Sequence, residues 1–227
     1  MNSISYTSDP GFQVIENLLS QRECDDLLMA LSSLQLARGR AGARHLMAIP
    51  QVAHLASDPR LMQIAQQALG SEPFPFRATL FEKSGKANWL VVWHQDTALP
   101  LRESFDQPGW GPWSKKAGID YAHAPAWALS RVVALRIHLD DSTTENGPLR
   151  AVPGSHKLGV LNDEEIASVV KERGYTECLV ARGGVLMMRP LLIHASSKGR
   201  TNAPRRVIHI EYADSMQLGP GIELATA

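Results

Sequence analysis

The chain has few cysteines, no charge imbalance and no long apolar run. Cys24 and Cys178 are its only two cysteines, so it lacks the disulfide framework that stabilises small secreted domains. We expect two ordinary thiols, although counting alone leaves a bridge between them open. No segment resembles a signal peptide, a membrane-spanning helix or a Ser-Lys-Leu ending. A reducing, cytoplasmic location is therefore the expectation.

The charges of the chain balance. Lys+Arg and Asp+Glu both number 23, so no overall field attracts nucleic acid or a membrane surface, and we expect neither as a partner. A small-molecule substrate is favoured instead, and the oligomeric state stays unknown. With 227 residues and 44% hydrophobic content, the chain can bury one sizeable core. We predict a single domain over residues 1–227.

Residue patterns predict helices first and short strands afterwards. A capping box at Ser20–Glu23 starts one helix (about 20–36), Asp58-Pro59 starts a second that ends at Gly70, and Asn162 caps a third. The β-rich runs are residues 77–82, 89–93, 132–139, 149–152, 179–180, 185–188, 191–194 and 207–212. This order predicts a mainly β fold with flanking helices, with a helical part at about 15–70 and a β core at about 76–213.

Three candidate metal ligands stand at the ends of two apolar runs. His94 and Asp96 follow one run, and His194 follows another. Because residues two apart in a strand share a face, we expect His94 and Asp96 to extend the face of Leu90 and Val92 into the interior. Two imidazoles and a carboxylate can bind one face of a divalent metal, as in non-haem Fe(II) oxygenases. The alternative is two hydrogen-bonded core histidines and an aspartate in a turn.

The longest stretch without predicted structure follows Asp96 directly. It runs over residues 97–128, contains Trp110, Trp113 and Trp127, and has prolines at positions 100, 108, 112 and 125. Long loops in compact domains are usually functional. We expect a lid-like loop whose aromatic side chains cover an apolar substrate, and the alternative is a packed surface excursion.

Several blocks around these residues resemble the phytanoyl-CoA dioxygenase family. They are Asn88–Asp96, Leu139–Asp141, Glu145–Leu149, Pro153–Lys157 and His194–Ser196 followed by Arg205, and their order over residues 76–213 matches the family. The resemblance implies a double-stranded β-helix, which is a jelly-roll, cupin-like barrel. It also implies Fe(II) bound by His94, Asp96 and His194, with 2-oxoglutarate as co-substrate and O2 as oxidant.

The resemblance further implies a site for 2-oxoglutarate. In the family, an arginine eleven places after the second histidine binds the far carboxylate of 2-oxoglutarate, and here that residue is Arg205. A planar guanidinium suits a bidentate grip on a carboxylate. The adjacent Arg206 leaves the register open by one residue. Ser196, on the same strand face as His194, matches a hydroxyl that assists in the family.

Two further cations are candidates for contacts with co-substrate or substrate. Arg136 lies on a strand face opposite an apolar face, so it lines a polar pocket or meets solvent. Lys83 and Asn88 precede the metal motif, where family members place such contacts. Their alternative is an ordinary exposed turn through Ser84-Gly85-Lys86.

The implied reaction oxidises a C–H bond of a small, partly apolar molecule, with 2-oxoglutarate converted to succinate and CO2. Asp96 favours hydroxylation or desaturation, because related halogenases lack this carboxylate. Two alternatives stay open: a non-catalytic jelly-roll binding protein, and a metal-dependent cupin-type enzyme that does not use 2-oxoglutarate. Arg205 argues against the second, because without a carboxylate to bind its buried charge would be costly.

Overall fold

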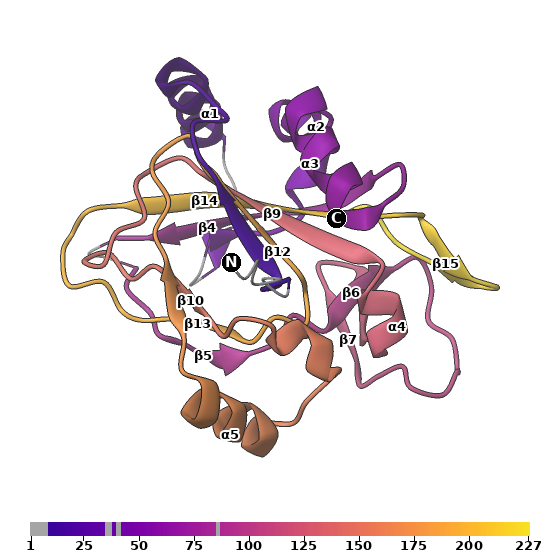
Figure 1. The fold of residues 1–227 in the computed structure, drawn as a ribbon. Helices are drawn as coiled ribbons and strands as arrows, with labels where there is room; N and C mark the ends of the chain where they lie inside the picture. Colours follow the sequence, from indigo (N-terminus) through magenta and orange to yellow (C-terminus); the bar gives the residue numbers. More distant parts are fainter. Residues whose placement is uncertain (1–8, 35–37, 40–41, 85–86) are drawn as a thin grey trace, which may run out of the picture.

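Two facing β-sheets form the centre of the protein, and helices cover their outer faces (Figure 1). The computed structural model describes residues 9–34, 38–39, 42–84 and 87–227. The larger sheet has the order β1 (Phe12–Ile15), β12 (Val185–Met188), β9 (Val132–His138), β14 (Arg205–Ala213), β4 (Phe74–Lys83), β3 (Gly42–Ala43) and β2 (Arg38–Gly39). The smaller sheet has the order β11 (Thr176–Cys178), β10 (Leu149–Ala151), β13 (His194–Ser196) and β5 (Val91–His94).

This arrangement confirms a mainly β jelly roll with flanking helices. Among the described strands, no ladder of hydrogen bonds joins the two sheets, so they face each other without closing into a barrel. Helices α1 (Gln21–Ser33), α2 (Pro50–Ala56) and α3 (Pro59–Leu69) lie over the larger sheet, and α5 (Asp163–Arg173) lies against the smaller one (Figure 1). Short 3-10 helices occupy Leu46–Ala48 and Ser155–Leu158.

Capping residues fix the three predicted helices. Ser20 and Asn162 form capping boxes at the starts of α1 and α5, and the Asp58 side chain accepts a hydrogen bond from the Arg60 amide at the start of α3. Gly70 ends α3 with a left-handed backbone. The sequence analysis missed α2, which has seven residues and no side-chain cap.

Side-chain alternation in the larger sheet separates an apolar face from a polar one. In β14, Ile208, Ile210 and Tyr212 pack with the helices in the main core. Strand alternation therefore directs Arg205 and His209 toward the smaller sheet. The neighbouring strand β9 alternates in the same way, so one of its faces also points toward the smaller sheet. The space between the sheets is thus lined partly by charged side chains.

Residues 97–128 are ordered, which corrects the prediction of an irregular loop. They form a separate sheet of β6 (Ala98–Leu101), β8 (Ile119–His123) and β7 (Trp113–Lys116), followed by the short helix α4 (Ala126–Leu129). Pro100 lies in β6, and because β6 is an edge strand the missing amide donor is tolerated. A C-terminal hairpin of β15 (Gln217–Gly219) and β16 (Ile222–Glu223) adjoins this sheet, through a bridge from Leu101 to Leu224.

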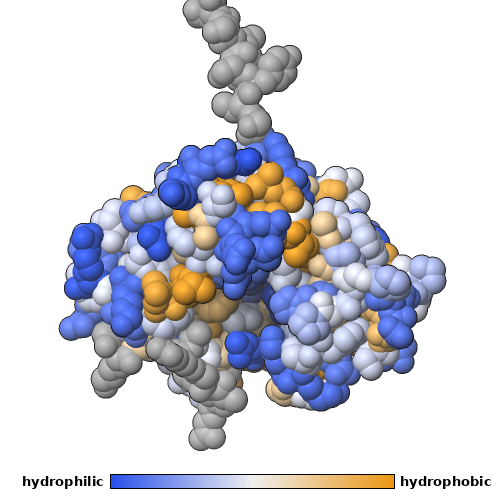
Figure 2. All heavy atoms as spheres, turned by 90° about the horizontal axis from the view of Figure 1, so that it is seen from below, coloured by the Kyte–Doolittle hydropathy of each residue, from blue (hydrophilic) through white to orange (hydrophobic). Residues whose placement is uncertain are grey.

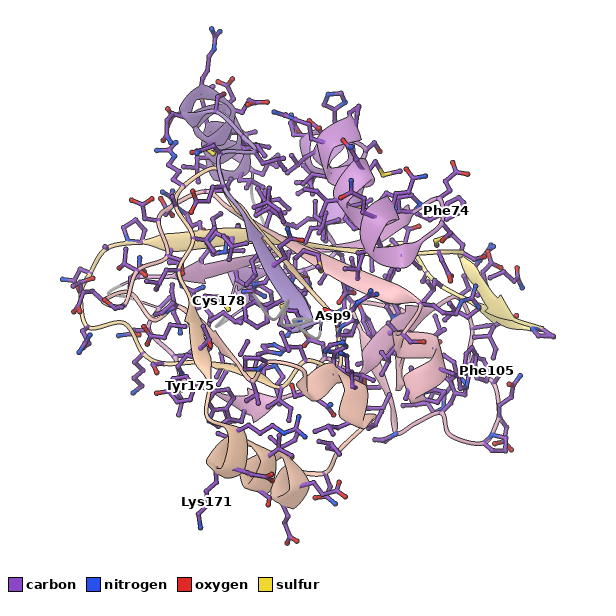
Figure 3. The ribbon with its side chains drawn as sticks, in the orientation of Figure 1. Asp9, Phe74, Phe105, Lys171, Tyr175 and Cys178 are labelled. Carbon is purple, nitrogen blue, oxygen red and sulfur yellow. The ribbon has the colours of Figure 1, made fainter. Side chains whose placement is uncertain are left out.

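The tryptophans of this segment pack against each other and not over a cavity. Phe105 makes edge-to-face contacts with Trp110 and Trp113, with ring centroids 5.2 and 5.1 Å apart. Trp127 joins Trp110 at 6.1 Å, and Phe105 lies beside α4 at one side of the molecule (Figure 3). Neither cavity described below is lined by a tryptophan of this segment.

The cysteines and two of the predicted strands differ in how well they match the sequence predictions. Both cysteines are buried free thiols, and Cys178 lies between the two sheets (Figure 3). Strand β13 begins at His194, whereas the sequence suggested a strand ending there, and Val180 forms only a single bridge to Ser142.

Within the described part of the chain, no helix is both long and apolar enough to cross a membrane. The face on the α5 side is mainly hydrophilic with separate hydrophobic patches (Figure 2).

Gly147 provides a test of local packing beside the site. Its φ is +71°, and an added Cβ would collide with the backbone oxygen of Ser197. Gly70 has a similar φ of +75° but open space around the Cβ position. We expect Gly70→Ala to cost roughly 1–2 kcal/mol of unfolding free energy, and Gly147→Ala more than about 3 kcal/mol because a backbone clash is added. Urea unfolding of both variants measures this, and equal losses would contradict the packing argument.

Candidate metal centre and adjoining cavities

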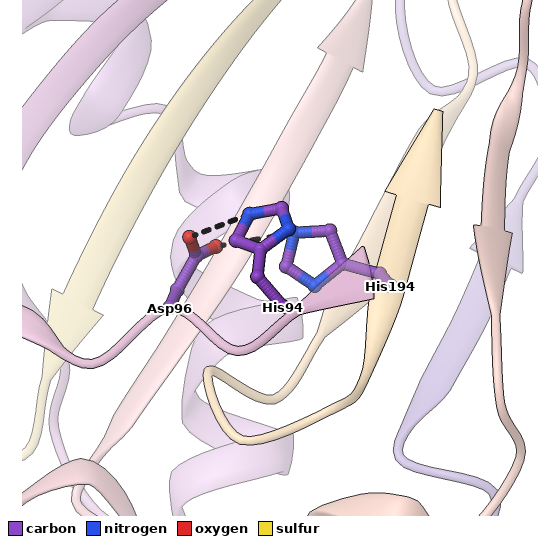
Figure 4. Close-up of side chains that lie close together, drawn as sticks. All are labelled: His94, Asp96 and His194. Atoms are coloured by element: carbon purple, nitrogen blue, oxygen red, sulfur yellow. Dashed lines mark ion pairs between the residues drawn. The ribbon is translucent and has the colours of Figure 1, made fainter. Parts of the chain in front are cut away.

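His94, Asp96 and His194 lie together between the two sheets (Figure 4). Antiparallel pairing of β13 with β5 places His194 opposite His94, and their ring centroids are 4.2 Å apart. Asp96 follows β5 and directs one carboxylate oxygen to each imidazole, at 3.7 Å from His94 Nε2 and 3.6 Å from His194 Nε2. All three potential ligand atoms lie within 4.8 Å of one another.

A β-bulge in β5 directs His94 into this cluster. The ladder with β13 shifts register between its two pairs, so two residues of β5, Val92 and Trp93, oppose the single residue Ala195 of β13. As a result, Val91 and His94 line the same cavity, while Leu90 and Val92 are 54% and 68% exposed. The prediction that Leu90 and Val92 share the inward face of His94 was therefore wrong, because simple alternation does not survive a bulge. Trp93 packs on the outer face against Arg150 and Tyr175.

Backbone carbonyls fix the tautomer of both imidazoles. His94 Nδ1 lies 2.8 Å from the carbonyl oxygen of Val92, and His194 Nδ1 lies 2.9 Å from that of Leu192. A carbonyl only accepts, so each Nδ1 carries the proton and donates it. Each Nε2 therefore presents a free lone pair toward Asp96.

The ionisation states complete the donor set. Burial lowers the pKa of His194 to about 4, so this imidazole is neutral near pH 7. Burial opposes the ionisation of Asp96, but His194 and then His94 outweigh it and keep the pKa of Asp96 below its usual value. Two imidazole nitrogens and one carboxylate oxygen thus converge, which is a donor set that suits Fe(II).

A cavity of about 80 Å³, here called the inner cavity, adjoins the His-Asp-His cluster on the β13 side. Arg136, Ser196 and Arg205 supply its polar lining, together with the cluster itself. Among its described lining residues, Asp96 is the only acid. The cavity therefore carries positive charge without a dedicated counterion.

Ser196 holds two of the cations beside this cavity. Its hydroxyl donates to the carbonyl of Gly147 at 2.9 Å and accepts from Lys83 Nζ at 2.6 Å. Arg205 approaches the same oxygen at 3.3 Å. Lys83 also donates to the carbonyl of Ser197. Lys83 is buried, which contradicts the exposed-turn alternative for this residue; Gly85 and Lys86 of that turn lie outside the described residues.

Buried donors in the inner cavity lack partners. Arg205 is 4% exposed, and its Nε and one Nη make no hydrogen bond within the described protein. Burial, with a contribution from Arg136, lowers the pKa of Arg205 to about 9. Burial, followed by Arg205 and Arg136, lowers the pKa of Lys83 to about 7. An anionic ligand in this cavity would satisfy these donors and relieve the repulsion.

Alternation in β14 places Arg205 and Arg206 on opposite faces of the strand. Arg206 points the other way and binds Asp140 through two hydrogen bonds of 2.7 Å. Arg205 lines the inner cavity. Asn88 lines neither the inner cavity nor the second cavity described below. Its side-chain amide donates a hydrogen bond to the carbonyl of Gly199 and accepts one from the Gly199 amide.

A second cavity of about 290 Å³, here called the outer cavity, lies on the other side of Asp96. Phe81 and Asp96 line both cavities. Its further polar lining includes Arg44, Arg77, Lys116 and Tyr121. The sequence analysis missed all four of these residues. Only Arg77 had a usable signal, because it shares a face of β4 with Phe81.

A buried hydrogen-bond chain runs between the two cavities. Arg136 donates to His209 Nδ1 at 3.0 Å, so His209 carries its proton on Nε2 and donates to Glu211 at 3.3 Å. Glu211 also accepts from Arg77. Arg136 is therefore inside, as one alternative predicted, and Arg77 has its charge balanced by Glu211.

Two blocks that carry the family resemblance, Glu145–Leu149 and Pro153–Lys157, have structural roles in this fold. Asn146 accepts a hydrogen bond from the Thr143 amide and donates one to the carbonyl of Asp141. Ser155 accepts from the Ile193 amide at 2.8 Å. His156 pairs with Asp9 at 3.5 Å and lines neither the inner nor the outer cavity.

Lys83 gives the ligand-free protein a defined pH dependence. Its folded pKa of about 7 lies below the ordinary 10.5, so between these values the unfolded chain binds more protons and stability rises with pH. We expect wild type to gain about 1 kcal/mol or more of unfolding free energy between pH 7.0 and 8.5, and Lys83→Met to lose most of this gain. Urea unfolding at both pH values measures it, and parallel responses of the two proteins would refute it.

Comparison with known proteins gives one family match. The family model described as phytanoyl-CoA dioxygenase (PhyH) matches residues 8–207. An ectoine dioxygenase of Halomonas elongata is 27% identical over 173 residues, covering 66% of this chain and 46% of that protein. An L-proline trans-4-hydroxylase of Streptomyces griseoviridis is 25% identical over 186 residues, covering 70% and 62%. The chain thus spans about half the length of the curated relatives it matches.

Solved structures give the same picture for the fold. AviO1 from Streptomyces viridochromogenes Tue57 superposes with a TM-score of 0.67 at 24% identity, covering 93% of both chains. EctD from S. alaskensis with 2-oxoglutarate and 5-hydroxyectoine superposes with a TM-score of 0.69 at 22% identity, covering 90% of this chain and 72% of that one. At these identities the likeness establishes the shared fold alone.

Proposed function

The chain belongs to the phytanoyl-CoA dioxygenase family, and from this premise we propose that it is an Fe(II)- and 2-oxoglutarate-dependent dioxygenase. It would hydroxylate a C–H bond of a small molecule, with release of succinate and CO2. One observation carries the proposal: two tautomer-fixed imidazoles and a carboxylate adjoin a cavity whose buried cations have no counterion other than Asp96 among the described lining residues. A binding protein has no need of both features together.

His94, Asp96 and His194 would hold the iron. The donor set fits, since both Nε2 lone pairs are free and the carboxylate is ionised. When bound, iron with O2 and 2-oxoglutarate supplies the oxidation of the C–H bond, and the protein supplies ligands, orientation and exclusion of water.

Arg205 would bind the far carboxylate of 2-oxoglutarate in the inner cavity. Its unpartnered Nε and Nη are the donors that a bidentate carboxylate uses. Ser196 orients Arg205 and Lys83 through one hydroxyl. Arg136 adds positive charge from β9 and is held by His209.

The substrate would occupy the outer cavity, which borders the His-Asp-His cluster at Asp96. We keep the single domain over residues 1–227 and the cytoplasmic location as predictions, with no nucleic acid or membrane as partner. Closure of segment 97–128 as a lid is also a prediction. That segment contributes Lys116 and Tyr121 to the outer cavity, which supports a role in substrate binding.

The test is an anaerobic titration of metal-free protein with Fe(II) and 2-oxoglutarate, followed by its visible charge-transfer band. A band that needs both additions, and succinate release under O2, are the expected results. Absence of the band in folded, iron-loaded protein would reject the use of 2-oxoglutarate and favour a cupin-type enzyme of another kind. Absence of iron binding would favour a non-catalytic binding protein.

A further inference from the structure

The outer cavity carries positive charge that the proposed reaction does not use. Its cations are Arg44, Arg77 and Lys116, and Asp96, the one carboxylate in its described lining, is assigned to iron. Glu211 balances Arg77. Within the described part of the chain, Arg44 and Lys116 have no ion-pair partner. The exposed Arg44 and the half-buried Lys116 therefore face this cavity with no acidic partner among the described residues.

Strand pairing explains how Lys116 comes to face the cavity. In β7, Lys115 lies opposite Asp120 of β8 and forms an ion pair with it at 2.8 Å. Neighbouring residues of a strand point to opposite faces. Lys116 therefore turns to the cavity side, where Asp120 is not its partner.

The Tyr121 ring lies beside two of the cations that line the outer cavity. Lys116 Nζ lies 4.6 Å from the centre of the Tyr121 ring, and the Arg77 guanidinium carbon lies 6.0 Å from it. The Tyr121 hydroxyl forms a hydrogen bond with His45 Nε2 at 3.0 Å. Burial lowers the pKa of Lys116, and Arg44 and Arg77 lower it further. The cations thus repel one another across the cavity in the absence of an anion.

We propose that the outer cavity binds a small organic anion, a carboxylate or a phosphate ester, whose acidic group pairs with Arg44 and Lys116. Charge-assisted hydrogen bonds to such a group are stronger than neutral ones, and the same cations disfavour a substrate with net positive charge. That this anion is the substrate rests on the proposed dioxygenase function. Binding of the anion itself does not.

The experiment compares three probes of similar shape: phenylacetate, phenyl phosphate and the neutral phenylacetamide. Binding is measured by calorimetry, without O2, to protein saturated with Fe(II) and 2-oxoglutarate so that the inner cavity is filled. We expect at least one anion to bind at least about tenfold more tightly than the amide, a difference of about 1.4 kcal/mol. Equal binding of all three probes, or no binding by either anion, would overturn the proposal.

Matched variants locate the effect. Lys116→Met and Arg44→Met should each weaken binding of the anion at least about fivefold, whereas Lys115→Met, on the opposite face of the same strand, should leave it unchanged. Equal losses in Lys115→Met and Lys116→Met would reject this cavity as the site. Repeating the titration with metal-free protein separates the two proposals. Anion binding to that protein would support this inference even if the added iron and 2-oxoglutarate gave no visible band, and the missing band would reject only the dioxygenase function.

Discussion

Replacing His194 with alanine should remove Fe(II) binding and abolish turnover. His194 supplies one of the three proposed ligand atoms, and loss of an outer partner of a metal ligand alone commonly costs 10–100-fold in metal affinity. Loss of the ligand itself should therefore exceed about 100-fold. Equilibrium dialysis against Fe(II), with the visible band of the 2-oxoglutarate complex as a second readout, measures it.

His156→Gln is the matched control, because this histidine belongs to the Pro-Gly-Ser-His block but pairs with Asp9 away from the cluster. It should retain iron binding. Circular dichroism and the unfolding midpoint of each variant separate ligand loss from misfolding. Wild-type iron affinity in folded His194→Ala would refute the assignment of this residue as a ligand.

Replacing Arg205 with methionine should change two properties in opposite directions. The affinity for 2-oxoglutarate should fall at least about 30-fold, because truncating one partner of a buried charge pair costs about 2 kcal/mol or more. The ligand-free protein should become more stable, because Arg205 is then a buried cation without a counterion. Titration of the visible band gives the affinity, and thermal unfolding without ligand gives the stability.

Arg206→Met supplies the contrast. It removes the ion pair with Asp140 on the other face of β14, so it should lower stability by about 1 kcal/mol and leave the affinity for 2-oxoglutarate unchanged. If Arg206→Met weakened 2-oxoglutarate binding and Arg205→Met did not, the register chosen for the carboxylate contact would be wrong.

Local signals in the sequence were sufficient for the elements they govern. The helices at Ser20, Asp58 and Asn162 were predicted because their capping residues lie next to them in the sequence. Alternation divided β14 into two faces but left open which one points inward, and Arg205 was preferred on the family spacing. Their positions at the ends of apolar runs named His94, Asp96 and His194 as candidate ligands but left core histidines as an equal alternative, and the family resemblance then favoured the metal site.

The remaining features depend on contacts between distant segments. The bulge in β5 is visible only in the pairing of β5 with β13. The sheet formed by residues 97–128 was hidden by its prolines, of which Pro100 lies in an edge strand and the other three lie outside the strands. The outer cavity joins Arg44, next to β3, with Lys116 of β7, and no local pattern connects residues so far apart.

The orientation of the two imidazoles tolerates substitutions at the residues that hold them. Each ring is held by the main-chain oxygen of the residue two places earlier, and every amino acid carries that oxygen. Val92, 68% exposed, can therefore be exchanged for a different side chain without loss of the tautomer. The orienting partner of each ligand is robust to mutation, and for the same reason it leaves no signature that a comparison of sequences would detect.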